Sequence, residues 1–275
     1  MELVTFIGED GRQRAGRVEG DQIVTLPAAS VREVLEATDW RASVPDVDGE
    51  RVNRSDVRLA PVVPDPAKIV CVGVNYRDHI EEMGNTPPSH PTYFAKFARA
   101  LAGPNDDLVL PSPDVTTHID WEVELAIVIG APARNVSGQE ALDVIAGYAV
   151  LNDVSIRDWQ RRTTQFLAGK TFEGLTPVGP GLVTSDVLGD GSGLGLSSSV
   201  NGVVKQDSST SQLVFGTVDI VSDLSRVMTL DPGDIIATGT PGGVGAARTP
   251  PEWLQSGDEL VSTIEGVGTL TNRCR

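Results

Sequence analysis

Two glutamates one residue apart, Glu122 and Glu124, open an apolar stretch that covers residues 121–129. Side chains of a β-strand alternate between its two faces, so both carboxylates are expected to point the same way. Ala126 and Val128 continue that face, which predicts that the strand leads into a core rather than along a wet surface. Two carboxylates on one buried face repel each other and lose hydration, so a cation or a shared proton must neutralise them.

A divalent metal ion is the chemistry that these carboxylates suggest. Hard cations prefer oxygen ligands, and Mg²⁺ is the first choice among them. A second apolar run, residues 146–151, ends on Asn152 and Asp153, and the carboxylate of Asp153 offers a third ligand. A half-exposed strand that carries two solvated glutamates is the alternative that the strand pattern alone leaves open.

A candidate acid–base pair follows the apolar run 68–74. His79 and Glu82 are three residues apart, so one helical turn would bring their side chains together. An imidazole paired with a carboxylate can take a proton from water and act as a general base. The loop over residues 84–88 could let this turn close over substrate as a lid. An incidental pair on a surface turn is the alternative.

Several cationic and polar side chains could bind an anionic substrate. Arg157 and Gln160 are expected on one helix face a turn beyond Asp153, where they could hold a carboxylate. Polarity of a helix surface explains them equally well. Lys96 and Lys170 each lie among apolar neighbours. Such lysines either pack their stems on a core with the ammonium group in water, or neutralise a buried carboxylate or enolate.

The other motifs exclude some chemistries. A glycine-rich run over residues 239–245, which includes Thr240, follows a short apolar run and could present backbone amides to an anion. No Gly-Lys-Ser/Thr follows it, so it is not a phosphate-binding Walker A loop. The chain has no Gly-x-Ser-x-Gly elbow and only three histidines, which makes a serine triad a weak candidate.

Composition bounds the class of protein. The chain has 275 residues with 40% hydrophobic content, enough for one large domain, or one large and one small domain. The formal net charge of −16 argues against partners such as nucleic acid or an anionic membrane. No apolar run is long enough to span a bilayer and no signal peptide is evident, so a cytoplasmic location is expected. Cys71 is expected in a core and Cys274 at the surface, without a disulfide.

Strand-like segments outnumber helical ones and do not alternate with them, which predicts an α+β, mostly β fold. The proline-rich segment 60–66 is expected to link a small N-terminal domain, residues 1–62, to a catalytic domain, residues 66–275. Residues 189–199 are expected to form a surface loop. Strands are expected over residues 3–7, 17–19, 22–26, 68–74, 108–110, 121–129, 146–151, 181–184, 200–205, 234–238 and 259–264, and helices over residues 30–37, 139–145, 155–166 and 220–228.

Together these residues resemble the fumarylacetoacetate hydrolase family, in its acylpyruvase and 2-hydroxyhepta-2,4-diene-1,7-dioate isomerase branch. The similarity runs from about Pro66 to Val267, and the first 60 residues match only loosely. The order and spacing of the segments carry the resemblance. The segments are residues 72–76 with His79 and Glu82, residues 121–125, Asn152-Asp153 with residues 157–160, Lys170 with Thr176-Pro177, residues 200–202 with Gln206 and Ser209-Thr210, and residues 233–236 with 239–241.

The resemblance implies a mixed β-sandwich roll as catalytic domain, and usually a homodimer. It implies Mg²⁺, or Mn²⁺ as a substitute, on Glu122, Glu124 and Asp153. It makes His79 and Glu82 the water-activating pair on a flexible lid, with Lys170 as a further catalytic residue. The residues that it places around a small anionic 2-oxo acid substrate are Arg77, Lys96, Arg157, Gln160 and Thr240, together with Lys170.

We therefore expect a Mg²⁺-dependent hydrolase that cleaves a carbon–carbon bond of a 3-acylpyruvate. Water activated by His79 would attack the distal carbonyl, and the metal and Lys170 would stabilise the pyruvate enolate that leaves. The alternative is a decarboxylase or isomerase of a 2-oxo or 2-hydroxy-diene dicarboxylate, such as oxaloacetate, on the same site. A binding protein without catalysis is a third possibility, although it would have no use for a water-activating base.

Overall fold

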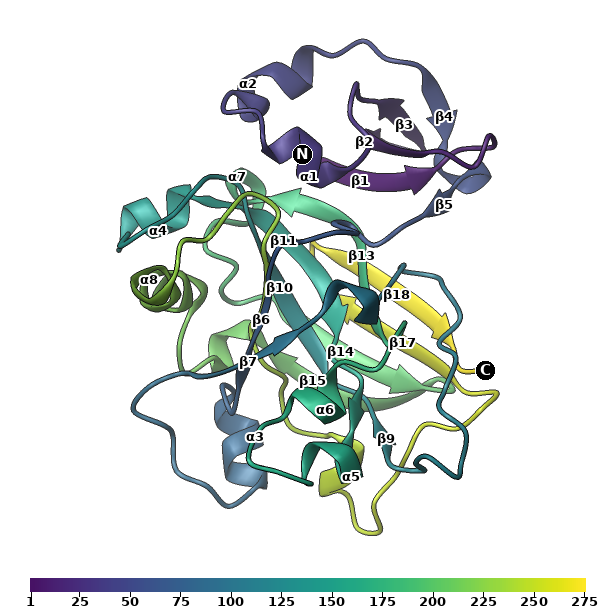
Figure 1. Cartoon of the computed structure of the whole chain (residues 1–275), viewed down its shortest axis with the longest axis vertical. Helices are drawn as coiled ribbons and strands as arrows, with labels where there is room; N and C mark the ends of the chain where they lie inside the picture. The colour runs from purple at the N-terminus through teal and green to yellow at the C-terminus, as the bar shows by residue number, and fades with distance from the viewer.

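The computed structural model describes all residues, 1–275, and its largest element is a mixed sheet that crosses the molecule (Figure 1). Its centre is formed by β10 (Val123–Ile129) and β11 (Ile145–Asn152), which pair antiparallel. In spatial order the strands are β4 (Arg51–Asn53), β3 (Gln22–Thr25), β2 (Gln13–Glu19), β1 (Glu2–Ile7), β13 (Thr176–Thr184), β11, β10, β16 (Ile235–Ala237), β6 (Ile69–Gly73) and β7 (Thr92–Lys96). Two short strands join off this path, β5 (Arg58–Leu59) beside β1 and β8 (Leu101–Ala102) beside β13.

A second, antiparallel sheet packs on the first. Its order is β15 (Val203–Ser209), β14 (Gly195–Val200), β17 (Glu259–Ile264) and β18 (Gly268–Arg273). Leu196, Ile264 and Leu270 of this sheet share one hydrophobic cluster with Leu125 and Ile127 of β10. The two sheets therefore enclose a common core, and the expected mostly β fold is confirmed.

The central strands are buried on both faces, which explains their nearly continuous apolar sequence. Leu125 and Ile127 pack into the cluster shared with α8 (Thr217–Val227). Ala126 and Val128 instead join a cluster that contains Leu35 of α1 (Val31–Leu35). The remaining helices are α2 (Trp40–Ser43), α3 (Arg77–Glu82), α4 (Gln139–Asp143), α5 (Arg157–Gln160), α6 (Leu167–Lys170) and α7 (Ser185–Leu188).

The N-terminal segment forms a unit of its own above the rest in Figure 1, but its sheet continues the central one. Strand β1 pairs with β13, with Leu3 opposite Leu182. Helix α1 begins where predicted, because the Ser30 hydroxyl accepts a hydrogen bond from the Glu33 N–H. The division into domains 1–62 and 66–275 stays a prediction.

Three expected elements differ from the structure. Residues 155–166 do not form one helix: β12 (Ser155–Ile156) pairs with β9 (Ile119–Asp120), and α5 ends at Gln160. The expected strand 200–205 is interrupted by a hairpin turn, where Asn201 and Gly202 have positive φ angles of 51° and 75°. The expected loop 189–199 ends in β14, whose alternating burial pattern shows that it belongs to the second sheet.

Cys274 is fully buried, contrary to expectation. The last strand ends beside Leu108, and Leu108 and Cys274 form an isolated bridge within a small hydrophobic cluster. The expected strand over residues 108–110 is reduced to this bridge and a hydrogen bond from the Leu110 N–H to the Arg275 carbonyl. Cys71, on β6, lies in the core as predicted.

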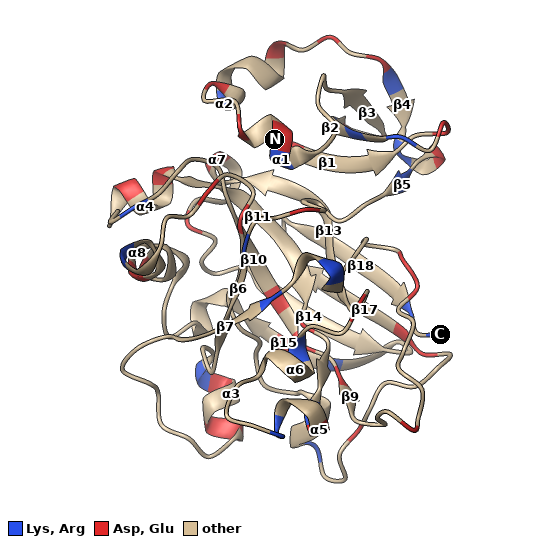
Figure 2. Cartoon of the chain, in the orientation of Figure 1, with Lys and Arg blue, Asp and Glu red and all other residues tan.

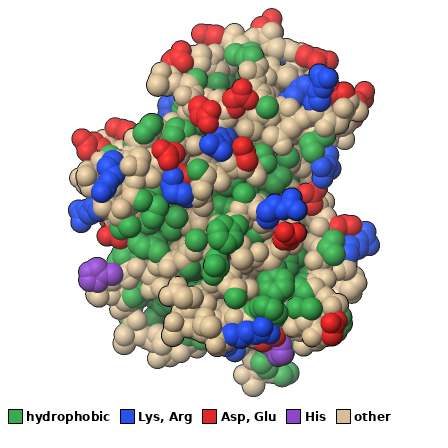
Figure 3. Space-filling view, viewed as in Figure 1, with side chains coloured by type: hydrophobic (Ala, Val, Ile, Leu, Met, Phe, Trp, Pro, Cys, Tyr) green, Lys and Arg blue, Asp and Glu red, His purple; other side chains and the backbone are tan.

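The surface carries mixed charge with an acidic excess, and Figure 2 shows acidic and basic positions interspersed along the chain. Figure 3 shows hydrophobic side chains gathered on the face below the N-terminal unit. Exposed apolar surface of this kind is typical of interaction sites, but the homodimer stays a prediction. No helix combines the length and the hydropathy that crossing a bilayer would require.

Candidate active site

The structure brings Glu122, Glu124 and Asp153 together at the end of the central strands. One carboxylate oxygen of each lies within 4.8 Å of those of the other two, and all three residues are buried. Glu124 belongs to β10, Glu122 precedes that strand, and Asp153 directly follows β11. The Asp153 N–H donates to the Glu122 carbonyl at 2.8 Å, so the pairing of β10 with β11 sets this convergence.

Three cationic side chains surround the carboxylates. The Lys170 ammonium donates to Glu122 Oε2 at 2.5 Å and to Asp153 Oδ2 at 2.8 Å. Arg157 contacts Glu122 Oε1 at 2.5 Å, and Lys96 donates to Asp153. These ion pairs are buried, so solvent screens them little.

Glu124 is the member of the triad without a cationic partner. Its one hydrogen bond comes from the Gly239 N–H, at 2.7 Å from Oε2. Burial, together with the negative charges of Asp153 and Glu122, raises the pKa of Glu124 well above its usual value. Glu122 shows the opposite: burial raises its pKa, but Arg157 and Lys170 outweigh that effect and hold it at about 2.

These residues fit a divalent cation. The donors are all hard oxygens, they lie close enough to share one ion, and Glu124 still needs a positive charge. Charge balance agrees with this. With Asp120 included, the buried cluster has one negative charge more than it has positive charges when every group is ionised. A divalent cation would leave the cluster with one net positive charge, which favours an anionic substrate.

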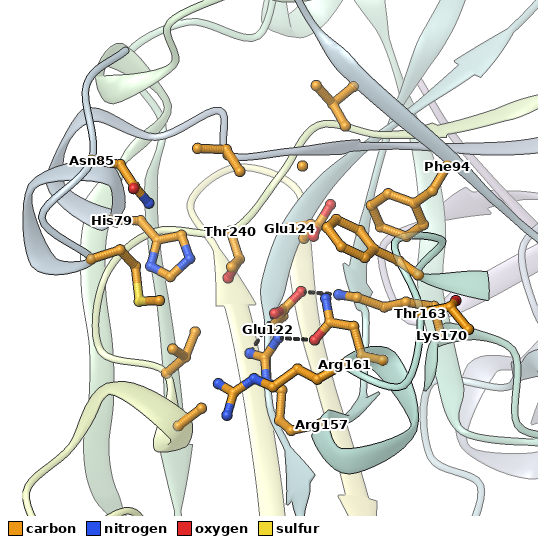
Figure 4. A pocket seen from close by; sticks show the side chains of 18 residues that line it. His79, Asn85, Phe94, Glu122, Glu124, Arg157, Arg161, Thr163, Lys170 and Thr240 are labelled. Atoms are coloured by element: carbon orange, nitrogen blue, oxygen red, sulfur yellow. Dashed lines mark hydrogen bonds and ion pairs between the residues drawn. The ribbon is translucent and has the colours of Figure 1, made fainter. Parts of the chain in front are cut away.

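Above the triad lies a cavity of about 380 Å³ (Figure 4). Arg157 and Lys170 lie opposite His79 in this view. The walls combine these polar groups with apolar side chains. The lining residues are Val72, Gly73, Val74, His79, Met83, Asn85, Phe94, Glu122, Glu124, Arg157, Gln160, Arg161, Thr163, Phe166, Lys170, Thr240, Val244 and Ala246.

The predicted pair is formed on α3. His79 Nδ1 lies 3.1 Å from Glu82 Oε2, as the three-residue spacing suggested. Glu82 also accepts the Gly243 N–H at 3.0 Å, which docks α3 on the glycine-rich loop. His79 lines the cavity and Glu82 stands behind it, so Glu82 can fix the imidazole while leaving Nε2 available.

Of the other predicted substrate-binding residues, some line the cavity and some do not. Gln160 and Thr240 line the cavity; the Gln160 side-chain oxygen accepts from Arg157 at 2.9 Å, and Thr240 donates to the Val123 carbonyl. The structure does not bring Arg77 to the cavity, because its guanidinium donates to the carbonyls of Ser211 and Leu213. Lys96 is buried behind Asp153, so its ammonium group supports that carboxylate and does not line the cavity.

Sequence reasoning missed Asp120, which organises this side of the site. Its carboxylate accepts Arg157 Nε at 2.7 Å and the N–H groups of Gly245 and Ala246 at 2.6 and 3.0 Å. It therefore connects the arginine to the loop that closes the cavity. A signal was present, because Asp120 continues the alternation of Glu124 and Glu122 by one more step of two residues.

Comparison with known proteins places these features in a family. The model described as "Fumarylacetoacetate (FAA) hydrolase C-terminal" matches residues 68–275. The Xenopus laevis protein named oxaloacetate tautomerase fahd2, mitochondrial, is 39% identical over an alignment of 287 positions, which covers 99% of this chain and 89% of that protein. The Bos taurus oxaloacetate tautomerase FAHD2A, mitochondrial, is 46% identical over 222 residues, 80% of this chain and 70% of the relative.

Solved structures with the same fold include a putative HpcE protein from Mycobacterium smegmatis. It has a TM-score of 0.89 and 35% identity, with 100% of this chain and 99% of that chain covered. A 2-hydroxyhepta-2,4-diene-1,7-dioate isomerase from Mycobacterium marinum has a TM-score of 0.81 and 35% identity, with 100% and 98% covered. The names of the vertebrate relatives place those proteins in mitochondria, so a cytoplasmic location of this chain stays a prediction.

Proposed function

This chain belongs to the fumarylacetoacetate hydrolase family, and we propose that it is a metal-dependent enzyme that interconverts the keto and enol forms of a small 2-oxo dicarboxylate such as oxaloacetate. The observation that carries the proposal is the placement of His79, fixed by Glu82, on the wall of a cavity whose floor is the carboxylate triad. An acid–base group facing a site for a polarised 2-oxo acid is what proton transfer beside a carbonyl requires.

The names of the relatives favour this reaction over the expected cleavage of a 3-acylpyruvate. Tautomerase and isomerase both describe the movement of a proton, without attack by water on a distal carbonyl. Hydrolysis would use the same placement of His79, but His79 would remove a proton from water and not from a carbon atom of the substrate. Carbon–carbon hydrolysis and decarboxylation therefore become the reactions that the experiment must separate from tautomerisation.

A divalent cation on Glu122, Glu124 and Asp153, with Mg²⁺ as our first choice, would polarise the 2-oxo group and make the adjacent C3–H bonds more acidic. His79 Nε2 removes a C3 proton as the C2–C3 double bond forms, and the resulting imidazolium gives that proton to the 2-oxo oxygen, so His79 returns to its neutral form. The reverse path returns the proton to C3, so atoms and charge balance without another reactant. Glu82 keeps Nδ1 engaged throughout, which holds the ring orientation.

Lys170 stabilises the negative charge that develops on the 2-oxo oxygen. Burial lowers the pKa of its ammonium group, but Asp153 and Glu122 outweigh burial and raise it above the usual value. Lys170 thus stays charged through the reaction and supplies a fixed positive group next to the triad. The Gln160 side-chain oxygen already accepts a hydrogen bond from Arg157, so its NH₂ group is the part that can donate to the substrate from the same side.

Deuterium exchange at C3 of oxaloacetate tests the proposal directly. The protein is incubated in D₂O with oxaloacetate and Mg²⁺, and NMR follows C3 deuteration and pyruvate formation above the background of Mg²⁺ alone. Tautomerisation predicts fast exchange without extra pyruvate, whereas decarboxylation predicts pyruvate in step with exchange. A parallel incubation with acetylpyruvate that released acetate and pyruvate, with no exchange of oxaloacetate, would instead establish the hydrolase. Full exchange activity of Glu122→Ala with excess EDTA would refute any role of the triad.

A further inference from the structure

Arg161 is the one cationic side chain of the cavity lining that has no ion-pair or side-chain hydrogen-bond partner. It directly follows α5, one residue after Gln160, and its side chain is exposed at the mouth. Figure 4 shows it on the same side of the cavity as Arg157. The next residue, Arg162, does not line the cavity, because its guanidinium stacks on Trp159 at 3.5 Å from the ring centre.

The other cations near the substrate are already committed to carboxylates. Lys170 bridges Glu122 and Asp153, Lys96 pairs with Asp153, and Arg157 pairs with Asp120 and Glu122. These groups and the metal suit the 2-oxo acid end of a substrate. None of these cations is left over for a second carboxylate further from the triad.

The rest of the cavity lining has no further positive charge for a second carboxylate, because its other polar side chains, Asn85 and Thr163, are neutral. Phe94 and Phe166 stack edge to face with ring centres 5.7 Å apart, and the apolar lining also includes Val72, Val74, Met83, Val244 and Ala246. A carboxylate placed against these side chains would lose hydration without gaining a partner. A guanidinium offers two parallel N–H donors that match a carboxylate, and Arg161 has all of its side-chain donors free.

We propose that Arg161 binds the distal carboxylate of the substrate and thereby selects 2-oxo dicarboxylates over 2-oxo acids with an uncharged far end. The proposal rests on the proposed function for the identity of the reacting end, and it adds the residue that defines the substrate class. Arg161 is a specificity residue in this scheme, because the proton transfer belongs to His79.

The first test compares Arg161→Gln with Arg162→Gln, which removes the same charge from the neighbouring position without touching the cavity. The substrates are oxaloacetate and its 4-methyl ester, which can enolise but lacks the distal charge. We expect Arg161→Gln to lower kcat/KM for oxaloacetate about 10- to 100-fold, the range for one charge-assisted interaction, and to leave the ester nearly unchanged. Arg162→Gln should leave both substrates nearly unchanged. An equal effect of Arg161→Gln on the two substrates, or no effect on either, would overturn the proposal.

A second test does not depend on turnover. Calorimetry with Mg²⁺ present compares malate, which carries a distal carboxylate and cannot tautomerise, with oxalate, which mimics only the reacting end. Arg161→Gln should weaken the binding of malate about 10-fold or more and leave the affinity for oxalate unchanged. If the wild-type protein binds malate through Arg161 but does not exchange oxaloacetate, the proposed function fails and this inference stands. If the wild-type protein catalyses deuterium exchange at C3 of oxaloacetate, but Arg161→Gln binds malate as tightly as the wild type does, only this inference fails.

Discussion

Replacing Glu124 by glutamine should stabilise the protein without metal and abolish its response to metal. In the metal-free protein Glu124 lies within 4.8 Å of two other carboxylates and has no cationic partner. At an effective dielectric constant of about 20, one such repulsion amounts to about 3 kcal/mol. Protonation avoids the repulsion, but holding a proton at pH 7 on a group whose ordinary pKa is 4.5 also costs up to about 3 kcal/mol.

The cost of the repulsion and the cost of the proton are similar. Lys170 and the Gly239 N–H partly compensate for either, so we expect Glu124→Gln to raise the free energy of unfolding by about 1–3 kcal/mol in EDTA at pH 7. The sign with pH follows from the raised pKa of Glu124. The folded wild-type protein binds a proton more tightly than the unfolded chain, so its stability falls as pH rises above about 4.5. The advantage of Glu124→Gln should therefore grow with pH.

Urea denaturation with EDTA and with Mg²⁺ measures both effects. Mg²⁺ at 100 times its dissociation constant should stabilise the wild-type protein by about 2.7 kcal/mol and Glu124→Gln hardly at all. Glu265→Gln is the matched control, since Glu265 is exposed and makes no ion pair or side-chain hydrogen bond. A lower stability of Glu124→Gln in EDTA, or the same gain from Mg²⁺ as in the wild type, would refute the reasoning.

Three further substitutions test the remaining geometry. His79→Gln should slow C3 deuterium exchange about 10²- to 10⁴-fold while calorimetry finds Mg²⁺ affinity unchanged; a parallel loss of affinity would contradict a purely acid–base role. Asp120→Asn should lower the free energy of unfolding in urea by about 2–4 kcal/mol, because buried Arg157 keeps its charge and loses a partner; an unchanged urea midpoint would contradict this. Gly169→Ala places a Cβ 2.4 Å from the Gln160 nitrogen, so it should cost about 1–3 kcal/mol in the same assay and lower kcat/KM; wild-type values would show that α5 and α6 can separate.

The local pattern of the sequence was enough for the core of the site. The alternation at Glu122 and Glu124 placed both carboxylates on one face, and the following apolar residues predicted that this face is buried. The three-residue spacing of His79 and Glu82 predicted their contact in the same way. Both pairs are only two or three residues apart in the chain, where the period of the local backbone fixes which side chains share a face.

Helix length was less predictable, for a physical reason. The polar residues after Asp153 favour a helix, but the backbone of Ser155 and Ile156 pairs with β9 instead. This pairing shortens the helix to residues 157–160. It also orients the Arg157 side chain toward Glu122 in the site. The partner strand lies more than 30 residues earlier in the chain, so no local preference records it.

Sequence alone thus determined the chemical character of this protein: an acidic triad, an imidazole–carboxylate pair and a mostly β framework to hold them. Only the tertiary structure decided which cation serves which carboxylate. Lys96 and Lys170 look alike in the sequence, yet one is sealed behind Asp153 and the other lines the cavity. Arg157 and Arg161 likewise differ in whether a carboxylate already holds them. Ion pairs between distant segments depend on how the strands come together, and that information is spread over the whole chain.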